Sequence, residues 1–186
     1  MSPPEAAYLL GYMRDRGTGT VVLEATSMGL LTHRVDHAFA DVGVFTNLTQ
    51  DHLDDHGTME NYRDAELRLF QGLCRRAVVN ADDPAGAGIA ALMPGAVTTY
   101  ALDAEADYRA TDLTMDAFGT RFTLQAAGQS AFASLSGAPS GSLPRTYSSG
   151  RLTTIASCVL RAITTTASSS ALGFSSRCGT YGGTKM

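Results

Sequence analysis

The chain has 186 residues, of which 44% are hydrophobic, and a mean hydropathy of −0.02, so it has the composition of a globular domain with one sizeable core. It contains no run of the roughly 18 to 20 apolar residues that a membrane span needs, and its N-terminus lacks the pattern of a signal peptide. Three scattered cysteines exclude a disulfide framework and a four-thiolate zinc site, so we expect a cytoplasmic protein with no membrane partner.

The net charge of −4 conceals an uneven distribution. All 18 acidic residues precede residue 126, whereas residues 126–186 contain five basic residues and Ser or Thr at 21 of 61 positions. This change predicts a domain at 1–125, followed at 126–186 by a Ser/Thr-rich tail that is disordered or translated out of frame. Five positive charges in this tail form no dense basic patch, so we expect no nucleic-acid partner.

Helical and strand patterns alternate along the first 125 residues. Helical spacing of apolar residues predicts helices at 5–16 and 59–73. Short β-branched and apolar runs predict strands at 20–25, 42–45, 76–83 and 96–102, and a small antiparallel hairpin near 108–125. This order favours right-handed crossovers, and therefore an α/β fold with a mainly parallel, Rossmann-like sheet flanked by helices.

The apolar run in each of the first three predicted strands ends in polar residues. They are Glu24 after the first run, Thr46 and Asn47 after the second, and Asn80, Asp82 and Asp83 after the third. In open α/β sheets, ligands bind beyond the carboxyl ends of the strands. We therefore expect these three clusters to converge on one site.

The segment 51–58 is rich in side chains that can bind a metal. His52 and His56 are four residues apart and lie among three aspartates, so on a helix both imidazoles would share one face, where a metal could bridge them. Alternatively, the segment is a hydrated loop in which Asp54 or Thr58 caps the next helix.

Glu66 falls near the centre of the apolar stripe of the helix predicted at 59–73. A carboxylate at that position meets a metal or an arginine, or else the helix is rotated relative to the prediction. Oxygen ligands from Glu24 and Glu66 would suit Mg²⁺, which commonly uses one or two carboxylates together with substrate phosphates. Arg34 could pair with a phosphate or carboxylate of a ligand, or with a carboxylate on the protein surface.

Three stretches, LEATSMGLLTHRVD, DVGVFTNLTQDHLDDHGTMENYRDAELRLF and AVVNADDP, resemble in this order the central ATP-binding domain of the Mur ligases, between about Pro3 and Leu124. The resemblance includes the members that add the third amino acid of the peptidoglycan stem. It implies that the carboxylate of a UDP-N-acetylmuramoyl-dipeptide is activated by ATP to an acyl phosphate, which the amine of an amino acid then attacks.

The resemblance also implies roles for individual residues. Glu24 and His52 would bind Mg²⁺ around the ATP phosphates. Glu66 stands where the family carries a carbamylated lysine that helps to bind magnesium, which makes it the candidate catalytic residue. The remaining implied contacts are Thr26, Thr32 and Arg34 with the UDP-muramoyl substrate, and Asn47, Asn80 and Asp83 with the nucleotide.

The chain also departs from the family pattern. A G-x-x-G-K-[ST] phosphate loop occurs nowhere in the 186 residues, and Met28 and Thr32 replace a histidine and a glutamine that are common in the family. The terminal domains that bind the uridine end and select the amino acid have no counterpart. We therefore expect a fragment of an ATP-dependent ligase with little activity alone. The alternative is a non-catalytic binding module or remnant that retains affinity for the UDP-muramoyl-peptide.

Overall fold

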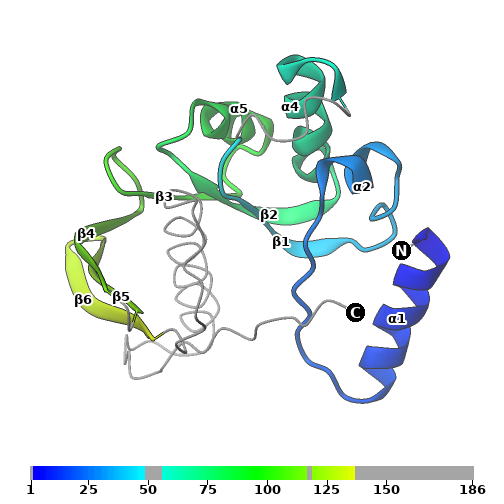
Figure 1. Cartoon of the computed structure of the whole chain (residues 1–186), viewed down its shortest axis with the longest axis horizontal. Helices are drawn as coiled ribbons and strands as arrows, with labels where there is room; N and C mark the ends of the chain where they lie inside the picture. The colour runs from blue at the N-terminus through cyan, green and yellow to red at the C-terminus, as the bar shows by residue number, and fades with distance from the viewer. Residues whose placement is uncertain (1, 49–55, 117–118, 137–186) are drawn as a thin grey trace. The chain divides into compact units, whose positions relative to one another are not determined.

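The computed structural model describes residues 2–48, 56–116 and 119–136. Among these residues, helices precede and separate the first three strands, and three more strands then follow without a helix (Figure 1). The helical elements are α1 (Pro3–Asp15), α2 (Ser27–Leu31), α4 (Met59–Leu67), the 3-10 helix η1 (Arg68–Phe70) and α5 (Pro84–Leu92). The strands are β1 (Ala40–Phe45), β2 (Cys74–Asn80), β3 (Val97–Ala101), β4 (Tyr108–Asp116), β5 (Gly119–Ala126) and β6 (Gln129–Ser136).

The strands form a six-stranded sheet in the order β1-β2-β3-β4-β5-β6. Strand β3 runs parallel to β4, and β5 runs antiparallel to both β4 and β6. Between consecutive strands, α4 and η1 link β1 to β2, and α5 links β2 to β3. The predicted α/β fold is confirmed, with its mainly parallel sheet, flanking helices and antiparallel hairpin.

The chain divides into two compact units. The first comprises Met1–Gly43, Leu48–Ala77 and Ala87–Val97, and the second comprises Val44–Asn47, Val78–Gly86 and Thr98–Met186. The first unit therefore holds α1, α2, α4 and η1. The second holds β4 to β6 and the carboxyl ends of β1, β2 and β3, which are the strand ends at which the polar clusters were predicted.

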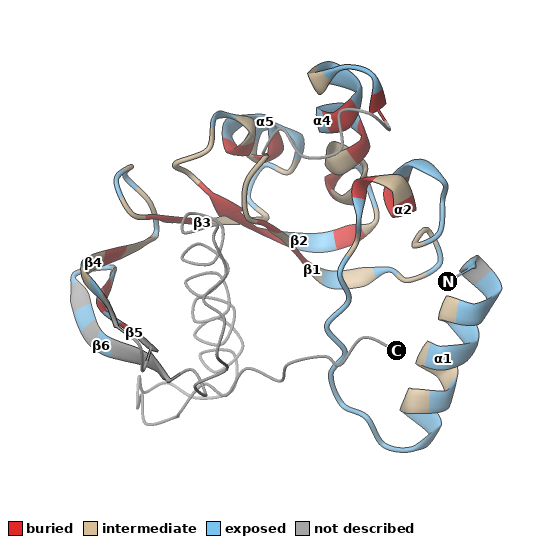
Figure 2. Cartoon of the chain, in the orientation of Figure 1, coloured by how far each residue is buried: buried red, intermediate tan, exposed pale blue. Residues whose placement is uncertain are grey.

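In the first unit, capping residues set where the helices begin. Thr26 and Thr58 are the N-caps of α2 and α4, and each side chain accepts a hydrogen bond from a backbone N–H of the first turn. Leu30 of α2 and Phe70 of η1 are buried, at 0% and 4% exposure. By contrast, α1 is largely exposed along its length (Figure 2), and Tyr8 is 75% exposed.

The second unit buries the ends of the central strands. Val78, Val79 and Tyr100 are at most 1% exposed, and α5 packs closely against the end of β2. Gly86 permits this approach, because a Cβ built there would lie 2.3 Å from the backbone oxygen of Asn80. A glycine is required here by contact rather than by a special backbone conformation.

The strand predicted at 20–25 is wrong. These residues form no regular element, and Val21, Val22 and Leu23 are 42%, 87% and 44% exposed. A β-branched run becomes a strand only where a neighbouring strand pairs with its backbone, and none does so among the described residues. Glu24 therefore does not follow a strand.

The helix predicted at 59–73 is shorter than expected, and two helices were not predicted. Helix α4 ends at Leu67 and continues as η1, and Gly72 then turns the chain at a φ of +120°. The two unpredicted helices are α2, which is too short to show a period, and α5, whose two glycines lower its helix propensity.

Regular structure also continues past the domain boundary predicted at residue 125. Strand β6 pairs with β5 from Ala126 opposite Gln129 to Gly119 opposite Ser136. Ala127 and Gly128 join the two strands at φ values of +48° and +77°, as in a two-residue hairpin turn. The sheet therefore continues to Ser136, eleven residues past the predicted boundary. The predicted tail beyond Ser136 lies outside the described residues.

Candidate functional site

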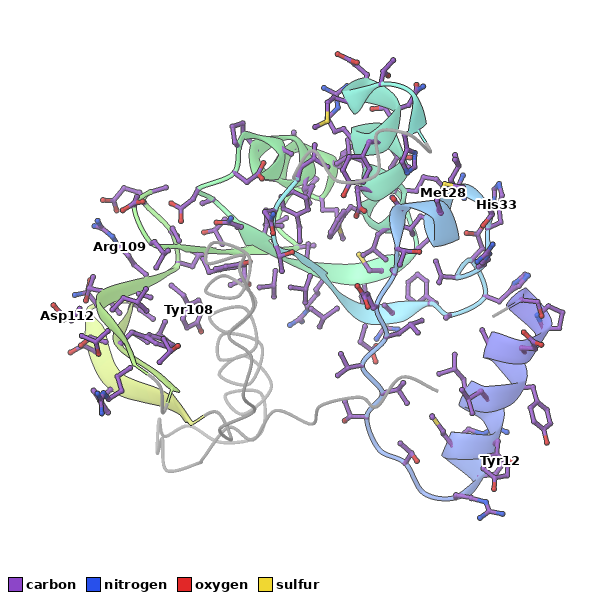
Figure 3. The ribbon with its side chains drawn as sticks, in the orientation of Figure 1. Tyr12, Met28, His33, Tyr108, Arg109 and Asp112 are labelled. Atoms are coloured by element: carbon purple, nitrogen blue, oxygen red, sulfur yellow. The ribbon has the colours of Figure 1, made fainter. Side chains whose placement is uncertain are left out.

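The predicted substrate-binding threonines lie at the two ends of α2. Thr26 Oγ1 accepts a hydrogen bond from the Gly29 amide at 3.1 Å, and Thr32 Oγ1 donates one to the Met28 carbonyl at 2.5 Å. Both residues are exposed. Thr26 Oγ1 therefore caps the first turn of the helix, and Thr32 Oγ1 bonds to its last turn. Met28 projects from the same short helix (Figure 3).

Arg34 lies in the turn that follows α2. Its backbone amide donates a hydrogen bond to the Gly29 carbonyl at 2.8 Å, which fixes the backbone of the turn. Its side chain is exposed and makes no hydrogen bond or ion pair with any residue in the described part of the chain. The sequence also allowed Arg34 to pair with a carboxylate on the protein surface, and no such pair occurs among the described residues.

His56 is a core residue. It is 6% exposed, its Nε2 lies 2.9 Å from the hydroxyl of Ser27, and its ring packs on Tyr62 with the centroids 5.1 Å apart. Its Nδ1 is buried and has no hydrogen-bond partner among the described residues. The hypothesis that His52 and His56 bridge a metal is not supported for His56, and His52 lies outside the described residues.

Thr58, one of the two predicted caps for the next helix, is confirmed as the N-cap of α4. Its hydroxyl accepts a hydrogen bond from the Asn61 amide at 3.2 Å, and the Asn61 side chain donates one to the His56 carbonyl at 3.0 Å. The other predicted cap, Asp54, lies outside the described residues.

The two candidate carboxylates for magnesium have different environments. Glu24 is exposed, and Glu66 is half-buried on α4. The buried stripe of that helix runs through Tyr62 and Ala65 instead of centring on Glu66, so the helix is rotated relative to the predicted stripe. Within residues 2–48, 56–116 and 119–136, no group of three or more His, Cys, Asp or Glu side chains could hold a metal.

Two of the three predicted polar clusters meet in the second unit. Asn80 is 1% exposed, and its side-chain amide donates a hydrogen bond to the Thr46 carbonyl at 2.8 Å. Its side-chain oxygen accepts one from the Asp82 amide at 3.0 Å. Asn80 thus joins the carboxyl ends of β1 and β2, with half-buried Asn47 next along the chain. Glu24, the first of the three predicted clusters, belongs to the first unit, so its predicted convergence with the other two clusters stays untested.

Asp82 has a role that the sequence analysis missed. Its carboxylate accepts hydrogen bonds from three successive backbone amides after β3, those of Leu102 at 2.6 Å, Asp103 at 3.1 Å and Ala104 at 2.7 Å. Asp83 accepts one from the Ala85 amide at 2.9 Å, at the start of α5. The sequence placed Asp82 in a polar cluster at the end of a strand, but the amides that bind it lie some twenty residues further along the chain and carry no sequence signal.

Tyr100 closes the same region from β3. Its hydroxyl donates a hydrogen bond to the Phe45 carbonyl at 3.2 Å, and its side chain is fully buried. Burial raises the pKa of this phenol far above its usual value, and the nearby carboxylates of Asp82 and Asp83 raise it further. Tyr100 is therefore a neutral hydrogen-bond donor that holds β3 to the end of β1.

A cavity of about 370 Å³ also opens in the second unit, between the loop that precedes β4 and the β5–β6 turn. Its polar lining includes Glu105, Asp107, Arg109, Gln125 and Ser130. Figure 3 shows Arg109 at the start of β4. No sequence motif singled out this cavity.

The sequence matches the family model of the Mur ligase middle domain over residues 2–138. The chain belongs to the Mur ligase family. It is 42% identical over 113 residues to the UDP-N-acetylmuramoyl-L-alanyl-D-glutamate–2,6-diaminopimelate ligase 2 of Clostridium acetobutylicum, a match that covers 59% of this chain and 23% of that protein. It is 43% identical over 119 residues to the corresponding ligase of Halalkalibacterium halodurans, covering 61% of this chain and 24% of that protein.

A solved structure gives the same family relationship. The chain aligns with the structure of a UDP-N-acetylmuramoyl-L-alanyl-D-glutamate–2,6-diaminopimelate ligase at a TM-score of 0.59 and 33% identity, covering 65% of this chain and 26% of that one. This Mur ligase chain thus spans about a quarter of the length of the relatives that it matches. None of its described helices combines the length and the apolar character that crossing a membrane requires.

Proposed function

We propose that the chain is the middle part of an ATP-dependent ligase of peptidoglycan precursor synthesis, which joins an amino acid to UDP-N-acetylmuramoyl-L-Ala-D-Glu. The observation that carries this proposal is the 42% and 43% identity to two proteins named as 2,6-diaminopimelate ligases for that substrate. The printed acceptor of both relatives makes 2,6-diaminopimelate the first amino acid to test.

The substrate would bind at α2 and the turn after it. Arg34 supports this assignment, because its exposed guanidinium has no partner among the described residues and is free to form a bidentate pair with a carboxylate or phosphate. Thr26 and Thr32, one at each end of α2, present hydroxyl groups on the same short helix. Helix α2 and the turn after it therefore bring these three polar side chains close together in the chain, as recognition of a polyanionic substrate needs.

The chemistry proposed for the site is carboxylate activation. A carboxylate of the substrate attacks the γ-phosphorus of ATP, which forms an acyl phosphate and releases ADP. The amine of the amino acid then attacks the acyl carbon, phosphate leaves, and the amine loses a proton. Asn47 and Asp83 would face the nucleotide, while Asn80, whose amide is used by Thr46 and Asp82, would hold the two strand ends beside it.

Magnesium would be held by Glu24, His52 and Glu66. The two glutamates fit the donor preference of this ion, because Glu24 is exposed and Glu66 is only half-buried, so both can offer oxygen ligands to an ion that keeps several waters. When bound, Mg²⁺ would offset the negative charge of the ATP phosphates during phosphoryl transfer. Glu66 would contribute a carboxylate where the family resemblance implies a carbamate.

A non-catalytic binding module is the second candidate, and it is favoured by the lack of a G-x-x-G-K-[ST] motif in the 186 residues. Isothermal titration of the purified chain with Mg-ATP and with UDP-N-acetylmuramoyl-L-Ala-D-Glu distinguishes the two, together with an assay of ADP release in the presence of 2,6-diaminopimelate. ADP release that depends on both substrates supports the ligase. Binding of the UDP-muramoyl substrate without turnover supports the module, and no binding of either ligand refutes both.

Matched variants locate the site. Arg34→Gln should abolish binding of the UDP-muramoyl substrate. Arg75→Gln, at an exposed arginine that pairs with Asp41 at 3.3 Å on the protein surface, should leave binding unchanged. Equal losses in both variants would indicate non-specific attraction of a polyanion by surface arginines.

A further inference from the structure

The turn that carries Arg34 has an unusual residue at its centre. His33 adopts a φ of +59°, in the left-handed region that favours glycine, directly after the last residues of α2. Its amide donates to the Leu30 carbonyl at 3.2 Å, and the next amide, that of Arg34, donates to the Gly29 carbonyl at 2.8 Å. These two bonds form the Schellman motif that commonly ends helices with a glycine. A histidine at this position accepts backbone strain that a glycine would avoid.

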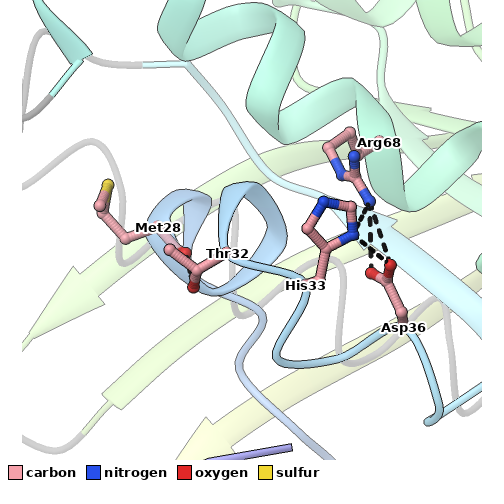
Figure 4. A network of polar contacts seen from close by, with 5 residues as sticks. All are labelled: Met28, Thr32, His33, Asp36 and Arg68. Carbon is pink, nitrogen blue, oxygen red and sulfur yellow. Dashed lines mark hydrogen bonds and ion pairs between the residues drawn. The ribbon is translucent and has the colours of Figure 1, made fainter.

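The imidazole of His33 contacts a carboxylate further along the same turn. Its Nδ1 lies 2.6 Å from a carboxylate oxygen of Asp36, three residues further along (Figure 4). Two acceptors at that distance would repel, so the contact assigns a proton to Nδ1, which donates it to Asp36. The His33–Asp36 bond therefore closes the turn over Arg34 and Val35.

Arg68 ties this closed turn to the next helical element. Its Nη2 donates to both carboxylate oxygens of Asp36, at 3.2 and 3.3 Å, and lies 3.0 Å from His33 Nδ1. With the proton on Nδ1, that nitrogen cannot also accept, so the guanidinium bonds to Asp36. The side chains of Arg68 and Asp36 are 30% and 25% exposed, which shields the pair partly from solvent.

The electrostatics keep this network assembled near neutral pH. The hydrogen bond from His33 lowers the pKa of the Asp36 carboxyl below its usual range, and the charge of Arg68 acts in the same direction. Asp36 therefore stays ionised and receives donors from two elements at once. An ion pair of this exposure contributes little to global stability, but it restricts the orientation of the turn that it joins.

We propose that Asp36 and Arg68 are positioning residues for Arg34. They fasten the turn that presents the Arg34 guanidinium to η1, which directly continues the helix carrying Glu66. The proposal rests on the substrate-binding role proposed above for Arg34. Affinity for the substrate anion then depends on the Asp36–Arg68 ion pair, which does not touch the anion, because this pair holds Arg34 in its binding orientation before the substrate binds.

Two measurements on the purified chain test the proposal. The first is hydrogen exchange of the Arg34 backbone amide by NMR, which reports the order of the turn without any ligand. We expect Asp36→Asn and Arg68→Gln to accelerate this exchange at least tenfold. Arg68→Lys, which keeps the charge, should restore much of the protection. Arg63→Gln is the matched control, since Arg63 is exposed on α4 and its one ion-pair partner within the described part of the chain is its neighbour Asp64.

The second measurement is isothermal titration with UDP-N-acetylmuramoyl-L-Ala-D-Glu. We expect Asp36→Asn to weaken binding five- to tenfold, a smaller loss than that of Arg34→Gln, because the Arg34 guanidinium is still present but is no longer held in its binding orientation. Urea denaturation should show nearly unchanged global stability in every variant, which separates positioning from unfolding.

The outcomes separate this inference from the proposed function. If Arg34→Gln abolishes binding but Asp36→Asn and Arg68→Gln bind normally, the inference is overturned and the substrate site stands. If the wild-type chain does not bind, the substrate site fails, and accelerated exchange in Asp36→Asn and Arg68→Gln still supports the restraint of the turn. Unchanged Arg34 exchange in both variants overturns the inference whatever the titration shows.

Discussion

Replacing Gly86 by alanine tests the contact between α5 and β2 in a way that separates packing from helix propensity. An alanine Cβ at this position would lie 2.3 Å from the Asn80 carbonyl oxygen and 3.0 Å from Val79 Cγ1. The first of these neighbours is backbone, so the helix would have to move away from the strand by roughly 1 Å to reach ordinary van der Waals separation. The movement would disturb the strand end at which Asn80 bonds to Thr46.

Helix propensity and overpacking act in opposite directions on the free energy of unfolding of Gly86→Ala. Alanine in place of glycine inside a helix stabilises by about 0.5–1 kcal/mol. Overpacking against a well-ordered neighbour costs about 1–3 kcal/mol, and a clash with backbone falls at the upper end of that range. We expect Gly86→Ala to lower the free energy of unfolding by about 2 kcal/mol. With an m-value of roughly 1–3 kcal/mol per molar urea, the urea midpoint should fall by about 1 M.

Gly88 provides the matched control on the same helix. A Cβ there meets nothing within 4 Å, so Gly88→Ala keeps only the propensity term and should raise the free energy of unfolding by up to about 1 kcal/mol. Equilibrium urea denaturation followed by circular dichroism gives both values. The reasoning is refuted if Gly86→Ala is as stable as the wild-type chain, or if the two alanine variants shift the midpoint in the same direction.

Three further predictions concern the polar contacts. Asp82→Asn should lower the free energy of unfolding, measured by urea denaturation, by about 1–3 kcal/mol, because it removes a charge and one acceptor oxygen from a carboxylate that binds three backbone amides. Asp103→Asn, at an exposed residue, should have little effect. The lowered pKa of Asp36 means that its stabilisation of the Arg34 turn is present above the unfolded pKa and is lost only as the pH falls below about 4, which NMR exchange of the Arg34 amide can follow. Tyr100→Phe should leave the spectrophotometric tyrosine titration unchanged up to pH 11, because Tyr100 does not ionise there, and should lower the free energy of unfolding by about 1 kcal/mol through the lost bond to Phe45.

Each of these three predictions would be contradicted by a specific outcome. Equal destabilisation by Asp82→Asn and Asp103→Asn would show that charge, and not the three amide bonds, is what matters. Protection of Arg34 that already disappears near pH 6 would contradict the assignment of Asp36 as the titrating group. One fewer ionising phenol in Tyr100→Phe would show that Tyr100 is accessible.

Patterns that are local in sequence predicted much of the fold. The helical period of residues 5–16 corresponds to α1, and the apolar runs around Val44, Val78 and Tyr100 correspond to β1, β2 and β3. These predictions succeed because alternation and helical spacing record which faces of an element are buried. The run at 20–25 shows the limit, since its composition suits a strand while its exposure shows that no neighbour completes one.

Part of the candidate site was predictable, and part was not. Residue type and position after a strand pointed to Asn80, and its bond to Thr46 brings two of the predicted clusters together. The partner of His56 is Ser27, 29 residues earlier, and no spacing rule connects them. Likewise, nothing in the sequence around Asp36 indicates that Arg68 will reach it.

The sequence by itself determined the α/β character, the family and the identity of the chemically capable side chains, because each of these is encoded in residue types and short-range order. Only the tertiary structure decided which of those side chains are already used within the protein. Asp82 and His56 are held by partners distant in the chain, whereas Arg34 is left facing solvent on a restrained turn. The reason is physical: a hydrogen bond or ion pair depends on a distance in space, and folding brings together groups whose separation along the chain carries no record of that distance.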